Sequence, residues 1–250
     1  HGRAIISAGV VGVALFGYIA SLFIPKGEPP APDMKIDWNP LRSTWDILSY
    51  VMPNKPVFRS ILGISWFWFI GAVFLAQFPT FSKDILGGNE QVSTLFLVIF
   101  SVGVGLGSTL CNRLLRGRVS GRLVPFACVG ISASTLLLYI FSGLTDKGAA
   151  LVGAAEFVSQ PLSWGVMLGL LLLAVSGGIF SVPMYAIMQS ESSDEHRARV
   201  VSCLNVLDSM GMVLSAVFTT IMLLLNISII NIFLIMGVFN LMLTPLLRRL

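Results

Sequence analysis

Apolar residues run along this chain in long uninterrupted stretches, and polar residues gather between them. A helix needs about 20 consecutive apolar residues to cross the hydrocarbon core of a bilayer. Strands of a membrane barrel would instead alternate apolar and polar residues over about ten positions. The pattern therefore predicts an all-α membrane protein with seven transmembrane helices in this chain, at 4–24, 58–78, 92–115, 123–142, 164–188, 200–225 and 228–247.

A proline-rich segment separates the first predicted span from the other six. Residues 25–57 hold seven of the 12 prolines, and proline interrupts helices. Inside this segment, residues 38–52 mix aromatic and aliphatic residues with Arg42 and Asp46, which predicts a short amphipathic helix on the membrane surface. We therefore expect three parts: the last span of an amino-terminal half (1–24), a linker with a short helix (25–57) and a carboxyl-terminal six-span bundle (58–250).

Composition and charge agree with a membrane protein and predict its orientation. Hydrophobic residues make up 55% of the chain and charged residues only 11%, where soluble domains have about 25% charged residues. Thirteen of the 16 lysines and arginines lie in alternate connections, the side that faces the cytoplasm in most membrane proteins. We expect a cytoplasmic linker and carboxyl terminus, and the net charge of +4 then reflects topology and not nucleic-acid binding.

The order of spans predicts that this chain is part of a larger transporter. Many secondary transporters consist of two six-span halves that move about a site near the middle of the membrane. Here a long linker and one preceding span lead into six closely spaced spans. Because the chain starts at His1 and the first span begins almost at once, we expect a longer protein whose amino-terminal six-span half contributes that first span.

Seven short segments carry a resemblance to a known family: 34–40 (MKIDWNP), 62–69 (LGISWFWF), 74–79 (FLAQFP), 83–88 (KDILGG), 101–107 (SVGVGLG), 182–189 (VPMYAIMQ) and 195–200 (EHRARV). They resemble lysophospholipid-transporter-type members of the major facilitator superfamily. The likeness is greatest to members fused to a glycerophospholipid acyltransferase and an acyl-(acyl-carrier-protein) synthetase. In such a fusion, the enzyme domains of this protein would follow Leu250.

The resemblance implies a function, a location and partners. Such a protein would move lysophospholipids, chiefly lysophosphatidylethanolamine, from the outer to the inner leaflet of a bacterial inner membrane for reacylation. Its partners would be the lysophospholipid, membrane lipid, the missing amino-terminal half and the cytoplasmic acyltransferase and synthetase. Two alternatives stay open: another major facilitator carrier for a small amphipathic solute or drug, and a membrane scaffold for the fused enzymes.

Asp208 is the strongest candidate for a functional residue. It lies about nine residues into its predicted span, roughly 13 Å along the helix, where a carboxylate is costly and usually faces a cavity or a partner. Polar or adaptable residues recur around it at three- and four-residue spacing: Ser202, Asn205, Met212, Ser215 and Thr219. Asp208 and Asn205 either line a substrate path, where Asp208 binds a cationic head group or carries a coupling proton, or belong to a packed polar interface.

Other candidates lie in the second span and in one cytoplasmic connection. Trp66 and Gln77 share a predicted span, and they either line the path of an acyl chain or pack against other helices. The family's cytoplasmic gate loop maps onto Asn112, Arg113, Arg116 and Arg118, with asparagine in place of the family's aspartate. These arginines either anchor the loop on the cytoplasmic side or contact anionic head groups. Gly103, Gly105 and Gly107 predict close helix packing.

The sequence offers little support for an enzyme. It has no Gly-x-Ser-x-Gly elbow and no phosphate-binding Gly-x-x-x-x-Gly-Lys-Ser/Thr loop, and neither histidine begins a His-x-x-x-x-Asp motif. The three cysteines form no Cys-x-x-Cys pair, and His196 lies among charged loop residues. We therefore expect a transporter with no cofactor and no metal ion.

Overall fold

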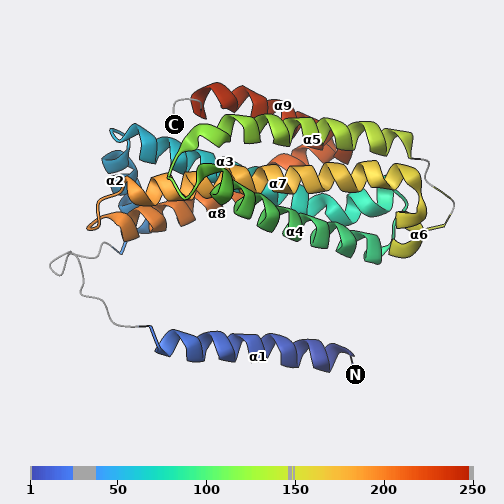
Figure 1. Ribbon diagram of the computed structural model, residues 1–250, viewed down its shortest axis with the longest axis horizontal. Coiled ribbons are helices and arrows are strands. Elements are labelled where there is room, and N and C mark those ends of the chain that lie inside the picture. The colour runs from blue at the N-terminus through green and yellow to red at the C-terminus, as the bar shows by residue number, and fades with distance from the viewer. Residues whose placement is uncertain (1, 25–37, 146–147, 149, 248–250) are drawn as a thin grey trace. The chain divides into compact units, whose positions relative to one another are not determined.

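The computed structural model describes residues 2–24, 38–145, 148 and 150–247, which are almost entirely helical and form no β-strand (Figure 1). The chain divides into two units, residues 1–36 and residues 37–250. The first unit contains α1 (Gly2–Leu22), an apolar helix whose described side chains are all exposed. A helix with apolar side chains on every face requires an apolar surrounding, which a bilayer or other transmembrane helices provide.

The second unit contains the other six predicted spans as helices: α3 (Lys55–Thr80), α4 (Glu90–Leu115), α5 (Val124–Leu144), α7 (Pro161–Ser190), α8 (Arg197–Leu224) and α9 (Ile229–Leu247). Among the described helices, α1, α3, α4, α5, α7 and α8 are long and apolar enough to cross a membrane, and the apolar part of α9 is shorter. The prediction of an all-α membrane protein is confirmed. The helices are consistent with the helical architecture expected of a major-facilitator-like membrane protein.

Helix α7 lies at the centre of this bundle, between α4 and α5 in Figure 1. It packs mainly against α4, α5 and α3, while α9 packs on α5 and α8 packs on α3. The side chains of α4 and α8 are the least buried of the long helices in the bundle. Because both helices are apolar, each presents a wide apolar face to its surroundings.

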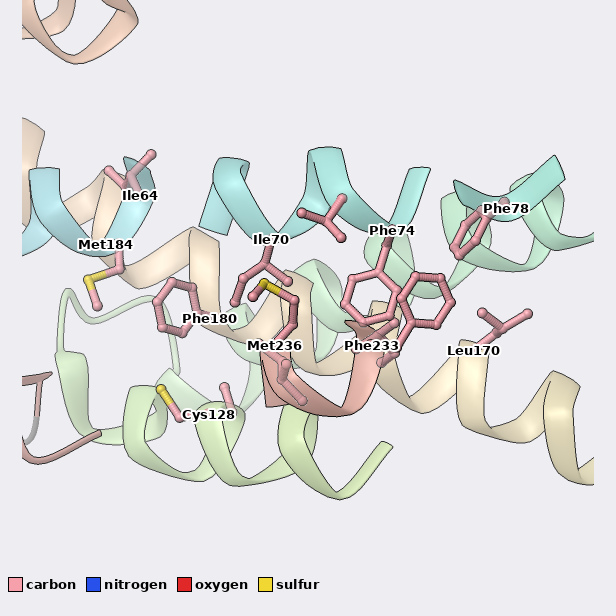
Figure 2. Packing of buried hydrophobic residues seen from close by; sticks show 14 of the residues in the cluster. Ile64, Ile70, Phe74, Phe78, Cys128, Leu170, Phe180, Met184, Phe233 and Met236 are labelled. Carbon is pink, nitrogen blue, oxygen red and sulfur yellow. The ribbon is translucent and has the colours of Figure 1, made fainter. Parts of the chain in front are cut away.

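Phenylalanines from several helices fill the core at one end of the bundle. Figure 2 shows the rings of Phe74 on α3 and Phe233 on α9 next to each other, with centroids 4.3 Å apart. Phe81 approaches Phe233, and Phe96 on α4 approaches Phe78. Such aromatic pairs add about 0.5–1.5 kcal/mol each beyond the area that they bury. They join α3 and α4 to α9, which is far from both in the sequence.

A helix, α2 (Pro40–Val51), lies within residues 38–52, where a short amphipathic helix was predicted. Its buried residues, Ile47 and Val51, face the bundle, whereas Trp45 and Tyr50 are exposed. Helix α2 packs mainly on α8, where the Cys203 thiol donates to the carbonyl oxygen of Thr44 at 3.6 Å. The helix of the linker is thus part of the second unit. Residues 25–37 of the linker lie outside the described residues.

The sequence patterns did not predict three short elements, a π-helix (Phe81–Ile85), a 3-10 helix (Gly121–Leu123) and α6 (Ala154–Ser159). The connection after the π-helix is held to the start of α6 by a parallel bridge between Gly88 and Val152. In this bridge, Asn89 N–H donates to the Val152 carbonyl and Val152 N–H donates to the Gly87 carbonyl, both at 2.9 Å. Gly87 has a φ of 66°, a conformation that favours glycine.

The positive-inside pattern leads to a prediction that cysteine labelling can check. We expect Val119→Cys, in the connection between α4 and α5, to react only after permeabilisation of the cell, and Glu156→Cys, on α6, to react with an impermeant maleimide in intact cells. Both positions are exposed, whereas the native cysteines Cys111, Cys128 and Cys203 are buried and give a low background. The opposite labelling pattern would reverse the topology.

Candidate functional site

Asp208 lies in the interface between α8 and α3, eleven residues after α8 begins, which is roughly 16 Å along the helix. Its side chain is buried, with 8% of its surface exposed. Ser65 on α3 donates a hydrogen bond from its hydroxyl to Asp208 Oδ1 at 2.8 Å. Among the described residues, Asp208 forms no ion pair, so one neutral donor is its main partner. A carboxylate with so little compensation within a membrane span is a functional candidate.

A tyrosine interacts electrostatically with this carboxylate, and a tryptophan donates a hydrogen bond to the tyrosine. Tyr185 on α7 is within electrostatic range of Asp208. Trp68 on α3 donates from its indole N–H to the Tyr185 hydroxyl at 2.9 Å. Helices α3, α7 and α8 thus each contribute a polar group near the middle of the bundle. Such a cluster can bind a proton or a cation at the carboxylate, and the aromatic rings can support a cation.

The polar residues that recur along α8 are divided between two surroundings. Ser215 and Thr219 are buried with Asp208, because they face α3. Ser202, Asn205 and Met212 are exposed. Asn205 lines a wide groove of about 550 Å³ along the outer face of α8. The three- and four-residue spacing predicted that these residues form one stripe along α8. In the structure, only the part of this stripe that contains Asp208, Ser215 and Thr219 is buried against α3.

Gln77 lies at another level of the contact between α3 and α8. It is half-buried and lines an open groove of about 560 Å³, whose walls come from the end of α3 and from Ser215, Thr219 and the residues between them on α8. Most of the exposed lining is apolar. A groove with apolar walls and a few hydroxyl and amide groups suits an amphipathic molecule.

Trp66 faces the interior of the bundle on another side of α3. Its indole N–H donates to Asn240 Oδ1 on α9 at 3.3 Å, and Asn240 Nδ2 donates to the carbonyl oxygen of Cys128 at 2.7 Å and to Ser132 Oγ at 3.1 Å. Asn240 is almost fully buried. The cavity beside Trp66 measures about 20 Å³, which is room for one water molecule. This geometry favours packing over an acyl-chain path for Trp66 in the conformation observed.

The residues that the sequence analysis assigned to a cytoplasmic gate lie at the end of α4 and just after it. Asn112, Arg113, Arg116 and Arg118 are all exposed. The helix ends at Leu115 and is capped by Arg116, which has a φ of 51°, and the backbone N–H of Gly117 donates to the Asn112 carbonyl. The loop thus presents its arginines on the surface at the predicted cytoplasmic end of the bundle.

The candidate residues do not converge on one cavity. Trp66, Asn205 and Gln77 line three different cavities, and the side chain of Asp208 is buried between two helices. The sequence analysis missed Asn240, although a lone amide within an apolar span is a signal of an interhelical contact. It also missed Ser65 and Tyr185. The sequence carries no such signal at these two positions, because serine and tyrosine are common in transmembrane helices.

Comparison with known proteins finds a distant relative among transporters. The chain is 23% identical over 189 residues to the lysophospholipid transporter LplT of Photorhabdus laumondii subsp. laumondii. The matched residues are 74% of this chain and 41% of that transporter, so the chain spans well under half of the relative's length. No protein-family model and no solved structure matches the chain.

The match and the apolar helices together support a multi-pass membrane protein with a distant likeness to a transporter. At 23% identity, the match supports at most a distant likeness to transporters of the lysophospholipid type. The interface between α3 and α8 combines a buried carboxylate with an open, mainly apolar groove, which makes it the strongest candidate site among the described residues.

Proposed function

We propose that this chain is the carboxyl-terminal bundle, with one preceding span, of a secondary transporter that moves a lysophospholipid across a bacterial inner membrane. Lysophosphatidylethanolamine is the proposed substrate class, and reacylation in the cytoplasmic leaflet is its proposed fate. The observation that carries the proposal is the match to a lysophospholipid transporter over 74% of the chain.

The physical character of the grooves supports a lipid over a sugar. The groove beside Gln77 and the groove beside Asn205 have mainly apolar walls and few hydrogen-bonding groups. A sugar requires many polar partners, because each buried hydroxyl that lacks one costs free energy. A single acyl chain requires an apolar wall, and its head group requires a few polar residues.

The wide exposed face of α8 supports a two-half architecture. We propose that this face, with Asn205 on it, turns toward an amino-terminal six-span half, and that Asp208 takes part in substrate binding or proton coupling when the helices move. We further propose that Asn112, Arg113, Arg116 and Arg118 belong to the cytoplasmic gate. In this arrangement, residues 25–57 connect the halves on the cytoplasmic side and the carboxyl terminus is cytoplasmic. Fused acyltransferase and synthetase domains would be its partners there.

Transport by the intact protein in vesicles tests the proposal. We expect reconstituted protein to move fluorescent lysophosphatidylethanolamine between leaflets, detected as a change in the fraction of probe that bovine serum albumin extracts. Vesicles without protein should keep the probe in the outer leaflet. A labelled sugar and a two-chain phosphatidylethanolamine serve as matched substrates, and neither should move at a comparable rate.

Two results would count against the proposal. Sugar uptake without lipid movement would reject the substrate class. Protein that folds and binds lysophospholipid but moves no substrate would favour a scaffold for membrane enzymes over a transporter.

A further inference from the structure

A pocket of about 310 Å³ opens between α2 and the first turns of α8. Its polar lining comes from Ser43 and Thr44 on α2 and from Arg199 and Ser202 on α8, and Trp38 stands at its edge. None of the described residues that line it is acidic. The described lining therefore offers a cation and several hydroxyl groups to a ligand, and it contributes no carboxylate.

Arg199 is half-buried and has no acidic partner among the described residues. Arg197, two residues earlier, shows the contrast, because it pairs with Asp194 at 2.6 Å and donates to the Gln189 and Ser192 carbonyls. A partly buried guanidinium without a counter-charge is costly. Its planar set of donors matches the oxygens of a phosphate group. The pocket thus has the chemistry of a phosphate site.

The surroundings of the pocket indicate that the phosphate belongs to a lipid. Trp38 is 89% exposed, and Trp45 and Tyr50 on α2 are exposed as well. The opposite face of α2 is buried against the bundle through Ile47 and Val51. Exposed tryptophan and tyrosine side chains on an amphipathic helix are typical of the level of the lipid head groups. The pocket opens beside this aromatic surface.

We propose that the pocket between α2 and α8 binds the head group of an anionic phospholipid of the phosphatidylglycerol class. Arg199 holds the phosphate, and the hydroxyls of Ser43, Thr44 and Ser202 meet the glycerol head group. A phosphatidylethanolamine binds more weakly, because its ammonium group finds no carboxylate in the lining. The site lies nine residues before Asp208 on α8, roughly 13 Å away along the helix, and it does not depend on which substrate the protein transports.

Lipid binding to the purified intact protein tests this site. We expect dioctanoyl-phosphatidylglycerol to bind saturably, and to bind more tightly than dioctanoyl-phosphatidylethanolamine, in a thermophoresis titration in detergent. Arg199→Gln should weaken the binding of phosphatidylglycerol about tenfold, the effect of losing charge-assisted hydrogen bonds. Lys55→Gln is the matched control, because Lys55 is an exposed cation at the same end of the bundle and does not line the pocket. Its binding should stay within about twofold of the wild type, which is within the range that exposed charges contribute.

A second variant separates loss of the site from loss of the fold. Ser202→Leu fills the pocket from an exposed position, so it should weaken phosphatidylglycerol binding while the unfolding temperature without lipid stays near that of the wild type. Equal binding of phosphatidylglycerol to the wild type, Arg199→Gln and Ser202→Leu would overturn the proposal. Inorganic phosphate or glycerol 3-phosphate that binds as tightly as the lipid would overturn the lipid as the ligand.

Discussion

Replacement of Asp208 by asparagine should lower the proposed lysophospholipid transport by about tenfold or more, since in this proposal the carboxylate supplies the charge that a lipid ammonium or a coupling proton requires. Asparagine keeps the size of the side chain, and its carbonyl oxygen can still accept the hydrogen bond from Ser65. We therefore expect expression and the unfolding temperature to change little. Initial transport rates in vesicles, normalised to the amount of reconstituted protein, measure the effect.

Ser65→Ala is the matched control for this variant. It removes the donor that contacts Asp208 Oδ1 but keeps the carboxylate. Interhelical hydrogen bonds contribute about 0.6–2 kcal/mol in membranes, so this change should lower stability slightly and leave most of the transport. Normal transport by Asp208→Asn, with both variants less stable, would assign Asp208 to the packed interface between α3 and α8 instead.

Replacement of Gly107 by alanine should destabilise the bundle more than the same replacement at the other two glycines of α4, Gly103 and Gly105. A Cβ atom at this position would overlap the backbone of Val175 on α7, with the Val175 Cα at 2.9 Å. Backbone atoms cannot move aside as the end of a side chain can, so the two helices must separate. Overpacking of this kind costs about 1–3 kcal/mol, which lowers the unfolding temperature by roughly 2–12 °C in a domain of this size.

Gly105→Ala provides the control on the same helix. Gly105 faces away from α7, and a Cβ atom there would meet nothing within 4 Å. Alanine has a higher helix propensity than glycine, so this variant should unfold at the same temperature as the wild type or slightly above it. Thermal unfolding of the purified proteins in detergent compares the two. A loss of stability as large in Gly105→Ala as in Gly107→Ala would show that the close contact between α4 and α7 is not the cause.

The sequence by itself determined the helices. A span that crosses a bilayer must be apolar over its whole length, because backbone and side chains find no water inside it, and this requirement can be read from the residues one span at a time. The seven spans were therefore predicted within a few residues of the observed helices. The short helix α2 was predicted from its mixture of apolar and charged residues, whereas the packing of Ile47 and Val51 against the bundle was seen only in the structure.

Only the tertiary structure decided which face of each helix meets which neighbour. Transmembrane helices are apolar on all sides, so the contrast between polar and apolar faces that orients a soluble helix is missing. The sequence predicted close helix packing at both Gly105 and Gly107, yet of these two glycines only Gly107 contacts α7. In the same way, Ser65 meets Asp208 and Trp66 meets Asn240, although the two residues are neighbours on α3. Close packing and the pairing of buried polar groups select these contacts, and both depend on the shapes of helices that are distant in the sequence.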